Sequence, residues 1–326
     1  MIDARNVPPS KYTRNTSAEE IASAVDLTGR LAVITGGSVG LGYETARVLA
    51  RAGAEVFIAA RRSDVLEAAA AALEAEGARV RYHVVDHMSV ESVDVLADAI
   101  LALDRPVDML IANAGIMACP LSRTEVGVES QFMTNVVAHA VLLSRLAKTL
   151  VRSDDGRFVS LSSTGHHLSP VNFNDLQFEL RPYDKWQAYG QSKTGCALLA
   201  VKAAGELGAR GVSAFAVHPG MIQTELGRHL GEDHRKSTEE RLGKNAAEAF
   251  YALFKDVQRG AATSVWAATE PDLKGRGPLY LEDANIAERI DAPNRTYGVL
   301  DYALDAKAAD RLWSEIEVMV GRQLPL

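Results

Sequence analysis

Short apolar runs alternate with helical stretches along most of this chain, and that alternation limits the possible folds more than any other feature. Helical spacing is clear in residues 40–51 and 64–76, each of which lies between two apolar runs. The runs are typical of strands buried on both faces, and they cover residues 31–35, 55–60, 79–85, 109–115, 157–163, 212–220 and 278–282. Strands that alternate with helices form βαβ units and a parallel sheet. We therefore predict an α/β fold, a single doubly wound domain with helices on both faces of the sheet.

The ends of this pattern set the domain boundaries. Residues 1–28 are predicted to form an N-terminal arm and a short helix, because prolines exclude helix before the capping-box pair Ser17 and Glu20. Residues 29–326 contain the whole alternating pattern, with no internal repeat and no low-complexity linker. We therefore expect one domain after the arm.

The charge and the cysteines exclude several classes of protein. The chain has a formal net charge of −7 and no basic run, so a nucleic-acid partner is not expected. Cys119 and Cys196 are far apart and the histidines lack ligand spacing, so neither a disulfide framework nor a metal site is expected. No run of about 18 apolar residues predicts a transmembrane helix, and the N-terminus lacks the apolar core of a signal peptide. We expect a cytoplasmic protein.

Polar residues and glycines directly follow six of the predicted strands. They occupy residues 35–42, 61–62, 86, 113–115, 162–163 and 219–220. In an open parallel sheet, ligands bind beyond the carboxyl ends of the strands, where the strand order reverses. The sequence therefore predicts one ligand site that these segments share.

The first of these segments, TGGSVGLG, is suited to a dinucleotide. Gly36, Gly40 and Gly42 allow a tight turn and a close approach of the backbone to a ligand. The helix that follows presents free N–H groups to a pyrophosphate. The spacing differs from G-x-G-x-x-G, and no Gly-Lys-Ser/Thr of a P-loop follows. A plain strand–helix turn is the alternative, but the position after the first strand of a βαβ unit favours a cofactor site.

The end of the second predicted strand indicates which dinucleotide binds. An NAD site usually places an acid here to hold the ribose hydroxyls, whereas this chain has Ala60 followed by Arg61 and Arg62. Arginine suits the 2′-phosphate of NADP, so we predict NADP, with NAD as the second choice and a solvated arginine pair as the alternative. Asp86 is predicted to accept from the adenine amino group, or else to be only a turn residue.

Further motifs make the chain resemble the short-chain dehydrogenase/reductase family. After the glycine loop, and in the family's order, the chain contains ANAG at 112–115, Asn135 within MTNVVAHAVLL, SLSS at 160–163, YGQSK at 189–193 and HPG at 218–220. The resemblance covers about residues 29–270. It implies a single Rossmann-type catalytic domain with a seven-stranded parallel sheet, and hydride transfer between a nicotinamide and a carbonyl or alcohol. It also implies a homodimer or homotetramer.

The resemblance assigns the site residues. Tyr189 would be the general acid/base, Lys193 its partner and a ligand of the nicotinamide ribose, Ser163 the residue that positions the substrate oxygen, and Asn135 the holder of a proton-relay water. The loop HPG would lie on the nicotinamide side, with Thr224 binding the carboxamide. The predicted cofactor-binding set is Gly36, Ser38, Gly40, Leu41, Gly42, Arg61, Arg62, Asp86, His87, Asn113, Ala114, Gly115, Tyr189, Lys193, Pro219, Gly220 and Thr224.

The chemistry of the tyrosine and the lysine agrees with this assignment. A free phenol has a pKa near ~10, but an adjacent ammonium and the positive nicotinamide of the oxidised cofactor favour the phenolate. The pKa then lies nearer the working pH, where proton transfer is efficient. Tyr189 and Lys193 are spaced to share one helix face. Taken without the other motifs, the two would most simply be a surface pair.

Two serines compete for the substrate-positioning role. Alternation along a strand puts Ser162 and Ser163 on opposite sides, so only one can face the site. We predict Ser163, because the family usually uses the second serine of such a pair. A hydrolytic alternative, with Ser163 activated by His166 or His167, lacks a nucleophile elbow of the G-x-S-x-G type.

The chain between the serine and the tyrosine, residues 164–188, is an insert that resembles the retinol dehydrogenase-like branch of the family. Its aromatic residues are Phe173, Phe178, Tyr183 and Trp186. They either line an apolar wall for a lipophilic alcohol or carbonyl, or pack the insert onto the body of the protein. Residues from about 221 to 260 are predicted to form a substrate lid.

These observations lead to one functional hypothesis and two alternatives. The hypothesis is an oxidoreductase, an NADP-preferring alcohol dehydrogenase or carbonyl reductase for a lipophilic substrate. One alternative is a regulator that binds the nicotinamide cofactor without turnover. The other is a lyase or epimerase on the same fold.

Overall fold

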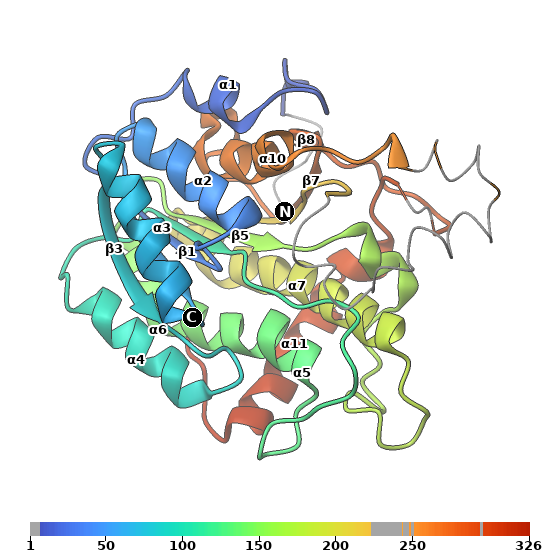
Figure 1. Cartoon of the computed structure of the whole chain (residues 1–326). Coiled ribbons are helices and arrows are strands. Elements are labelled where there is room, and N and C mark those ends of the chain that lie inside the picture. Colours follow the sequence, from blue (N-terminus) through green and yellow to red (C-terminus); the bar gives the residue numbers. More distant parts are fainter. Residues whose placement is uncertain (1–6, 223–242, 244–247, 249–250, 294–295) are drawn as a thin grey trace.

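The computed structural model describes residues 7–222, 243, 248, 251–293 and 296–326. Its centre is an eight-stranded sheet in the order β3-β2-β1-β4-β5-β6-β7-β8 (Figure 1). Seven strands are parallel, and they are β1 (Leu31–Thr35), β2 (Glu55–Ala60), β3 (Arg79–Val84), β4 (Met109–Ala112), β5 (Arg157–Leu161), β6 (Ser213–His218) and β7 (Leu279–Glu282). The prediction of a doubly wound, parallel sheet is confirmed. The eighth strand, β8 (Asn285–Ile286), is antiparallel to β7 and was missed, because two residues give no periodic pattern.

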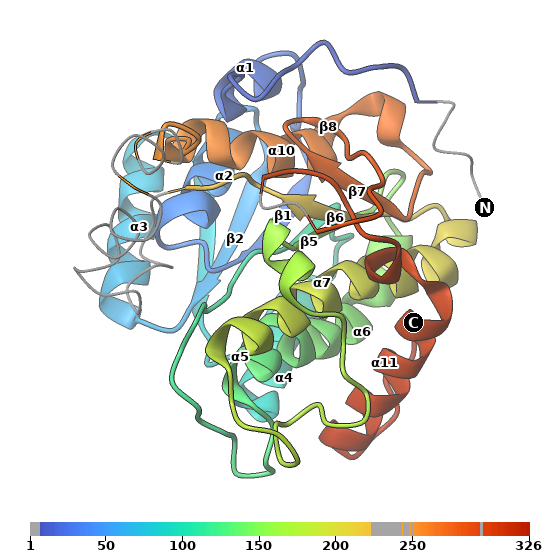
Figure 2. The ribbon, with the colours of Figure 1, turned by 90° about the vertical axis from the view of Figure 1, so that its right-hand side faces the viewer.

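Helices cover both faces of the sheet, as Figure 2 shows. One layer contains α2 (Gly40–Arg51), α3 (Ser63–Ala75) and α10 (Val257–Thr269), with α1 (Ala18–Ala22) packed outside α2 and α10. The other contains α4 (Val90–Leu101), α6 (Ala138–Val151) and α7 (Lys185–Leu207), with α11 (Ala306–Val320) packed on α7. Successive residues of β1 enter different cores, because side chains alternate across a strand: Val33 packs on the α6 side and Ile34 on the α2 side.

Four strands end earlier than predicted, and the difference shapes the site. The apolar runs extend to residues 85, 115, 163 and 220, but β3 ends at Val84, β4 at Ala112, β5 at Leu161 and β6 at His218. Asn113 leaves the ladder because its side-chain Nδ2 donates to the carbonyl of Thr35 at 2.8 Å. The polar residues at 113–115 and 162–163 therefore lie in the turns beyond the sheet edge.

The described part of the N-terminal arm is fastened to the domain. The predicted capping box begins α1, since the backbone N–H of Ser17 donates to the Glu20 carboxylate at 2.6 Å and the Glu20 N–H returns to the Ser17 hydroxyl at 3.2 Å. Upstream, the N–H of Ser10 donates to Oδ1 of Asn285 at 3.1 Å, which ties the arm to β8.

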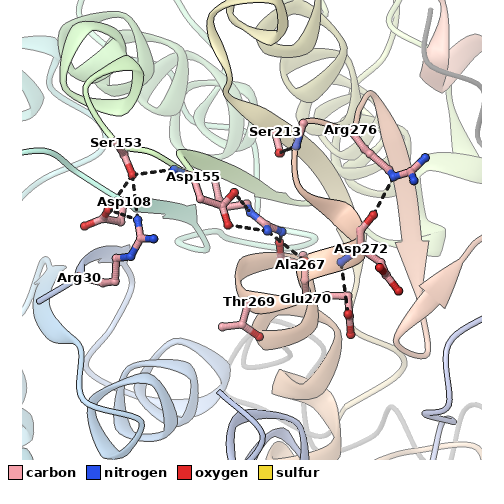
Figure 3. Close-up of polar contacts among 12 residues, drawn as sticks. Arg30, Asp108, Ser153, Asp155, Ser213, Ala267, Thr269, Glu270, Asp272 and Arg276 are labelled. Carbon is pink, nitrogen blue, oxygen red and sulfur yellow. Dashed lines mark hydrogen bonds and ion pairs between the residues drawn. The ribbon is translucent and has the colours of Figure 1, made fainter. Parts of the chain in front are cut away.

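The amino-terminal edge of the sheet carries a network of polar contacts (Figure 3). Arg157, at the start of β5, is 0% exposed; its Nε and one terminal nitrogen each donate to the Asp155 carboxylate at 2.8 Å. The same guanidinium donates to the carbonyls of Ala267 and Glu270, at 3.2 and 3.0 Å, and so closes the end of α10.

A second part of this network joins β1 to β4. Asp108 accepts from Arg30 at 2.8 Å, from the N–H of Leu31 at 2.7 Å and from Ser153 at 2.6 Å. These groups stabilise the start of the strands, at the edge opposite to the predicted ligand site.

Candidate active site

The glycine loop is built around the junction of β1 and β4. The Thr35 hydroxyl oxygen accepts from the N–H groups of Asn113 and Ala114, each at 3.0 Å. Gly36 and Gly40 have positive φ values, +66° and +55°, which L side chains rarely adopt. A Cβ at Gly42 would lie 2.2 Å from the carbonyl oxygen of Gly36, so only glycine fits there. The predicted pattern of glycines therefore has a backbone cause at each position.

The helix behind this loop has the features that a pyrophosphate site needs. The residue that precedes α2 is Val39, whose side chain makes no capping hydrogen bond to the helix. The first N–H groups of a helix lack intrahelical partners, and together with the helix dipole they attract an anion. Ser38 and Leu41, which flank Val39 and Gly40, are half-buried beside this helix start. The residues present thus fit the phosphates of a dinucleotide.

The two arginines after β2 differ in their surroundings. Arg62 forms an ion pair with Asp64 at 2.9 Å, and both side chains are exposed. Arg61 is also exposed, and within the part of the chain that the structure describes it has no ion pair or hydrogen bond from its side chain. The sequence did not distinguish the two arginines. Within the described residues, the structure shows that Arg61 is the one whose N–H groups are not already used on a neighbouring side chain.

The residues after β3 also have distinct environments. Asp86 is exposed, and its Oδ1 accepts from the N–H of Met88 at 3.0 Å, so it is part of a turn. The ring of His87 is buried, lies edge-on to His139 with centroids 5.3 Å apart, and has a pKa lowered to about 4 by burial. The side chain of His87 therefore packs inside, while that of Asp86 remains at the sheet edge.

Asn135 lies in a π-helical turn, Met133–Val137, between the short α5 (Ser130–Phe132) and α6. The Asn135 side chain reaches two other segments of the chain. It accepts from the N–H of Ile116 at 2.9 Å and donates to the Ile116 carbonyl at 3.0 Å and the Ser192 hydroxyl at 2.8 Å. Such π-turns are frequent at functional sites.

A histidine that the sequence did not single out joins this turn to the glycine loop. One ring nitrogen of His139 lies 2.9 Å from the Asn135 carbonyl and the other lies 2.9 Å from the Thr35 hydroxyl. Burial lowers the pKa of His139 to about 3, so the ring is neutral. Since the carbonyl can only accept, Nδ1 carries the proton and Nε2 accepts from Thr35.

The tyrosine and the lysine of the YGQSK motif lie on α7, as predicted, but not on the surface. Tyr189 is 4% exposed and Lys193 is 5% exposed, with the ammonium 5.7 Å from the centroid of the tyrosine ring. Nζ of Lys193 donates to the Leu161 carbonyl at 2.9 Å, at the end of β5. Within the described residues the Tyr189 hydroxyl has no hydrogen-bond partner. The burial excludes the surface-pair alternative.

A single glycine shows that these groups converge. A Cβ built on Gly115 would lie 3.1 Å from Oδ1 of Asn135 and 3.6 Å from Nζ of Lys193. The ANAG segment therefore passes between the π-turn and α7. The absence of a side chain at this position leaves room where the asparagine and the lysine meet.

The two serines after β5 have different partners. The Ser162 hydroxyl is buried, donates to the Lys193 carbonyl at 2.8 Å and receives the Tyr280 hydroxyl at 3.3 Å. The Ser163 oxygen is half-exposed and accepts from the N–H of Gly165 at 3.0 Å. The two serine side chains thus point to different surroundings, as the alternation along the strand predicted. Among the described residues, the Ser163 hydroxyl has no acceptor for its proton and can donate it to a ligand.

Gly165 is a functional position that the sequence reasoning missed. A Cβ there would lie 2.5 Å from Cε1 of Tyr189 and 3.3 Å from the Ser163 oxygen. The glycine thus lets the tyrosine ring pack against the serine turn. The signal was the glycine two residues after the serine in SSTG, which only the contact with α7 explains.

The histidines after the serine do not face its hydroxyl as a base. Nδ1 of His166 lies 2.7 Å from the Ser163 carbonyl, and Nε2 accepts from the N–H of Leu300 at 3.3 Å. His167 lies with Nε2 3.0 Å from the Gly298 carbonyl. Both nitrogens of His166 are thus bonded to main-chain groups, which argues against the hydrolytic alternative.

The aromatic residues of the insert fall into two groups. Phe178 is buried, Tyr183 donates to the Cys119 carbonyl at 3.0 Å, and Phe173 stacks under Arg311 at 4.5 Å, so these three pack the insert onto the body. Trp186 is half-buried, and its ring meets that of Tyr189 at 6.5 Å, nearly perpendicular. Only Trp186 among the four contacts a predicted catalytic residue.

The side chain of Lys255 packs against the loop that follows β6. Nζ of Lys255 is buried, pairs with Asp283 and lies 3.4 Å from the Pro219 carbonyl; its side chain packs against Gly220. Nδ1 of His218 accepts from the N–H of Thr164 at 3.3 Å. Thr224 and most of the predicted lid, about residues 221–260, lie outside the described residues.

The described residues lack two kinds of feature, a cluster of metal ligands and a membrane-spanning helix. Over the described ranges, no cluster of three or more histidine, cysteine, aspartate or glutamate side chains is arranged to hold a metal ion. Over the same ranges, no helix has the length and apolar character needed to cross a membrane.

Comparison with known proteins agrees with the motifs. The family model described as short chain dehydrogenase matches residues 30–235. A probable oxidoreductase of Streptomyces lividans is 42% identical over 292 residues, which cover 89% of this chain and 97% of the relative. Retinol dehydrogenase 13 of Mus musculus is 33% identical over 301 residues, which cover 92% and 86% of the two chains. A solved structure, blue fluorescent protein from a metagenomic library in complex with NADPH, is 26% identical with a TM-score of 0.60, over 79% of this chain and 98% of that one.

Proposed function

Because this chain belongs to the short-chain dehydrogenase/reductase family, with the predicted relation to retinol dehydrogenases, we propose that it is an NADP-preferring alcohol dehydrogenase or carbonyl reductase for a lipophilic substrate. The family makes it an oxidoreductase that uses a nicotinamide cofactor. One observation carries the more specific proposal. The Tyr189 phenol, the Lys193 ammonium and the Ser163 hydroxyl are brought together at the carboxyl edge of the sheet, and the phenol has no partner among the described residues.

The cofactor would lie along this edge. The glycine loop and the start of α2 would hold the pyrophosphate, Asp86 the adenine amino group through its second carboxylate oxygen, and the Pro219–Gly220 turn the nicotinamide side. Arg61, with its unused donors, would bind the 2′-phosphate. The NADPH of the similar metagenomic protein supports this choice. When bound, the nicotinamide supplies or accepts the hydride.

The residues of the chain would manage the proton. An oxygen that gains charge as a carbonyl is reduced needs a hydrogen-bond donor and then a proton. Ser163 would donate the hydrogen bond, and Tyr189 would transfer its hydroxyl proton. The nearby Lys193 ammonium would stabilise the phenolate that remains, because the two groups would carry opposite charges. Asn135, next to the lysine across Gly115, would hold the water that returns the proton.

The lipophilic substrate is inferred from the surface beside the phenol. Trp186 is one helical turn before Tyr189, meets its ring and remains half-buried. An indole face next to the reacting oxygen favours apolar or aromatic carbonyl compounds over highly polar ones. Replacing Trp186 by alanine should therefore raise the KM for a bulky apolar ketone more than the KM for a small one.

The test of the proposed function is a screen of lipophilic aldehydes, ketones and alcohols, followed by NADPH absorbance. Consumption of NADPH with stoichiometric formation of an alcohol would support the reductase. Tyr189→Phe should lower turnover by about 10³-fold, within the range for loss of a general acid, with NADPH affinity unchanged. Binding without consumption across the panel would favour the regulator, and product formation without net consumption would favour the lyase or epimerase.

Oligomeric state and location stay predictions. We expect a cytoplasmic homodimer or homotetramer, as the family resemblance implies. Light scattering coupled to size-exclusion chromatography measures the oligomeric state directly, and a single monomer peak would contradict the expectation.

A further inference from the structure

A segment of the chain outside the family match contacts the turn that follows the predicted catalytic serine. The family model ends at residue 235, but residues 298–302, here called the C-terminal strap, bond to His166 and His167. The Leu300 N–H donates to Nε2 of His166 at 3.3 Å, and the Tyr302 hydroxyl donates to the His166 carbonyl at 2.6 Å. A third bond joins Nε2 of His167 to the Gly298 carbonyl. Three hydrogen bonds to His166 and His167 therefore hold the strap against the turn that follows Ser163.

The strap is itself held firmly in the domain. The N–H of Gly298 donates to both carboxylate oxygens of Glu282, each at 3.0 Å, at the end of β7. The next residue, Val299, is buried and exchanges main-chain hydrogen bonds with the segment at residues 288–290, at 2.8 and 3.0 Å. The contact with the histidines is thus made by a segment whose position is fixed from the other side.

The strap and the Ser163 carbonyl place the proton of His166 on the same nitrogen. Because the Leu300 N–H donates to Nε2, that nitrogen is an acceptor, and Nδ1 must hold the hydrogen in the neutral ring. Burial keeps the ring neutral by lowering the pKa of His166 to about 3. Nδ1–H then donates to the Ser163 carbonyl at 2.7 Å, with the Tyr280 hydroxyl farther away, at 3.2 Å. The bond from the strap therefore favours the tautomer that bonds to the serine carbonyl.

The peptide group after Ser163 is held at both ends. Its carbonyl accepts from His166, and its N–H, which belongs to Thr164, donates to Nδ1 of His218 at 3.3 Å. The Ser163 oxygen also accepts from the Gly165 N–H at 3.0 Å. With the peptide and one lone pair of the hydroxyl fixed, the direction of the remaining O–H is restricted.

We propose that His166 is a positioning residue, through which the C-terminal strap directs the Ser163 hydroxyl toward the substrate oxygen. This inference rests on the proposed function, because it assigns a purpose to the geometry of Ser163. It adds a part of the chain beyond the family motifs to the machinery of the reaction. The competing view is that His166 and the strap merely pack against each other.

Three variants separate the two views. His166→Leu removes the ring bonds to Ser163 and Leu300 and the contact with the Tyr280 hydroxyl. His166→Asn keeps an N–H donor near the position of Nδ1, and Tyr302→Phe removes only the hydroxyl on the strap. Tyr297→Phe is the matched control, since Tyr297 precedes the strap, is 47% exposed and has no hydrogen bond within the described residues. We expect kcat to fall about tenfold in His166→Leu and less in the other two, as expected for slight misplacement of a catalytic donor. NADPH affinity should stay within about twofold of the wild type, and His166→Asn should recover most of the loss.

A double-mutant cycle with Ser163→Ala decides the mechanism. If His166 acts through the serine, His166→Leu should cause little further loss of kcat in the Ser163→Ala background. Additive losses in the cycle would overturn the inference, even with a fully active wild type.

Hydrogen–deuterium exchange gives a readout that does not depend on activity. In Tyr302→Phe, exchange in the peptide that covers residues 161–168 should rise several-fold, and it should not change in Tyr297→Phe. Unchanged exchange in both variants would overturn the inference, whether or not a substrate is found. A wild type that consumes no NADPH over the whole screen would count against the proposed function alone, and the exchange measurement would still decide whether the strap holds the serine turn.

Discussion

At the amino-terminal edge of the sheet, Arg157 is completely buried and uses its donors on Asp155 and on two carbonyls at the end of α10. At the carboxyl edge, Tyr189 is almost as deeply buried, but its hydroxyl has no partner among the described residues. Burying a polar group is costly unless its hydrogen bonds are made. The arginine stabilises the fold because each of its three guanidinium nitrogens donates a hydrogen bond. The tyrosine keeps its hydrogen-bonding capacity for a substrate, because its hydroxyl is not among the described polar atoms that are buried without a partner.

The largest expected effect is that of low pH on the free energy of unfolding, because buried neutral histidines gather at the carboxyl edge of the sheet. His87, His139, His166 and His218 all lie at the carboxyl edge, and burial lowers their pKa values to about 4 for the first and about 3 for the others. Between these values and 6.5, the unfolded chain binds protons that the folded chain does not, so the free energy of unfolding falls as pH falls from 6.5 toward 4. At pH 5 the loss is up to about 2 kcal/mol for each histidine.

Two buried carboxyls oppose this trend. Burial raises the pKa of Glu282 to about 7 and also raises the pKa of Glu129, so their contributions favour folding at low pH and are lost as pH rises through the raised pKa values. With four histidines against two carboxyls, the net effect should be a lower guanidinium midpoint at pH 5 than at pH 7. An equal or higher midpoint at pH 5 would show that the histidines are not buried in neutral form.

Removing the arginine should weaken the fold and leave the chemistry intact. Arg157→Met leaves the Asp155 carboxylate and two carbonyls without their donor, and we expect a loss of about 3–5 kcal/mol in the free energy of unfolding. Arg152→Met is the matched control, because the exposed Arg152–Asp104 pair, at 3.4 Å, should contribute less than about 1 kcal/mol. Urea titration measures both. If Arg157→Met lost turnover at full stability, the separation of the two edges would be wrong.

Adding one methyl group at Gly165 should lower turnover and leave the free energy of unfolding nearly unchanged. In Gly165→Ala the new Cβ would overlap the ring of Tyr189, so the ring must shift and turnover should fall about 10²-fold. Gly205→Ala, on α7 itself and with nothing within 4 Å of the added Cβ, should keep full turnover. Initial rates with saturating NADPH test this pair. Equal rates in the two variants would remove Gly165 from the site.

The arginines after β2 should differ from each other. Arg61→Ala should weaken NADPH binding about 10- to 100-fold, because it removes charge-assisted hydrogen bonds to the 2′-phosphate, and should leave NADH binding nearly unchanged. Arg62→Ala should have a smaller effect, since that guanidinium is already paired with Asp64. Fluorescence titration with both cofactors measures the constants. Equal losses for NADPH and NADH would argue against the 2′-phosphate role.

The parts of the site that the sequence predicted are those with local causes. The glycine loop and the spacing of Tyr189 and Lys193 depend on residues close together in the chain, so periodicity and motif order are sufficient to find them. The fold class can also be predicted from local pattern, because each βαβ unit has its own alternation of strand and helix periodicity.

The missed features depend on contacts between distant segments. The π-turn at Asn135 exists because its side chain bonds to Ile116 and Ser192, and neither bond has a signature in the helical pattern. The C-terminal strap and the eighth strand likewise lack a periodic signal of their own. The insert was only half predicted: its aromatic residues are visible in the sequence, but only their contacts show that Trp186 faces Tyr189 while the others pack inward.

The most direct test of the comparison is to measure the free energy of unfolding and the turnover of Tyr189→Phe together. The account predicts that the free energy of unfolding stays within about 0.5 kcal/mol of the wild type, because no hydrogen bond is lost within the described residues, while turnover falls about 10³-fold. Turnover that survives, or a loss of stability as large as that of Arg157→Met, would contradict it.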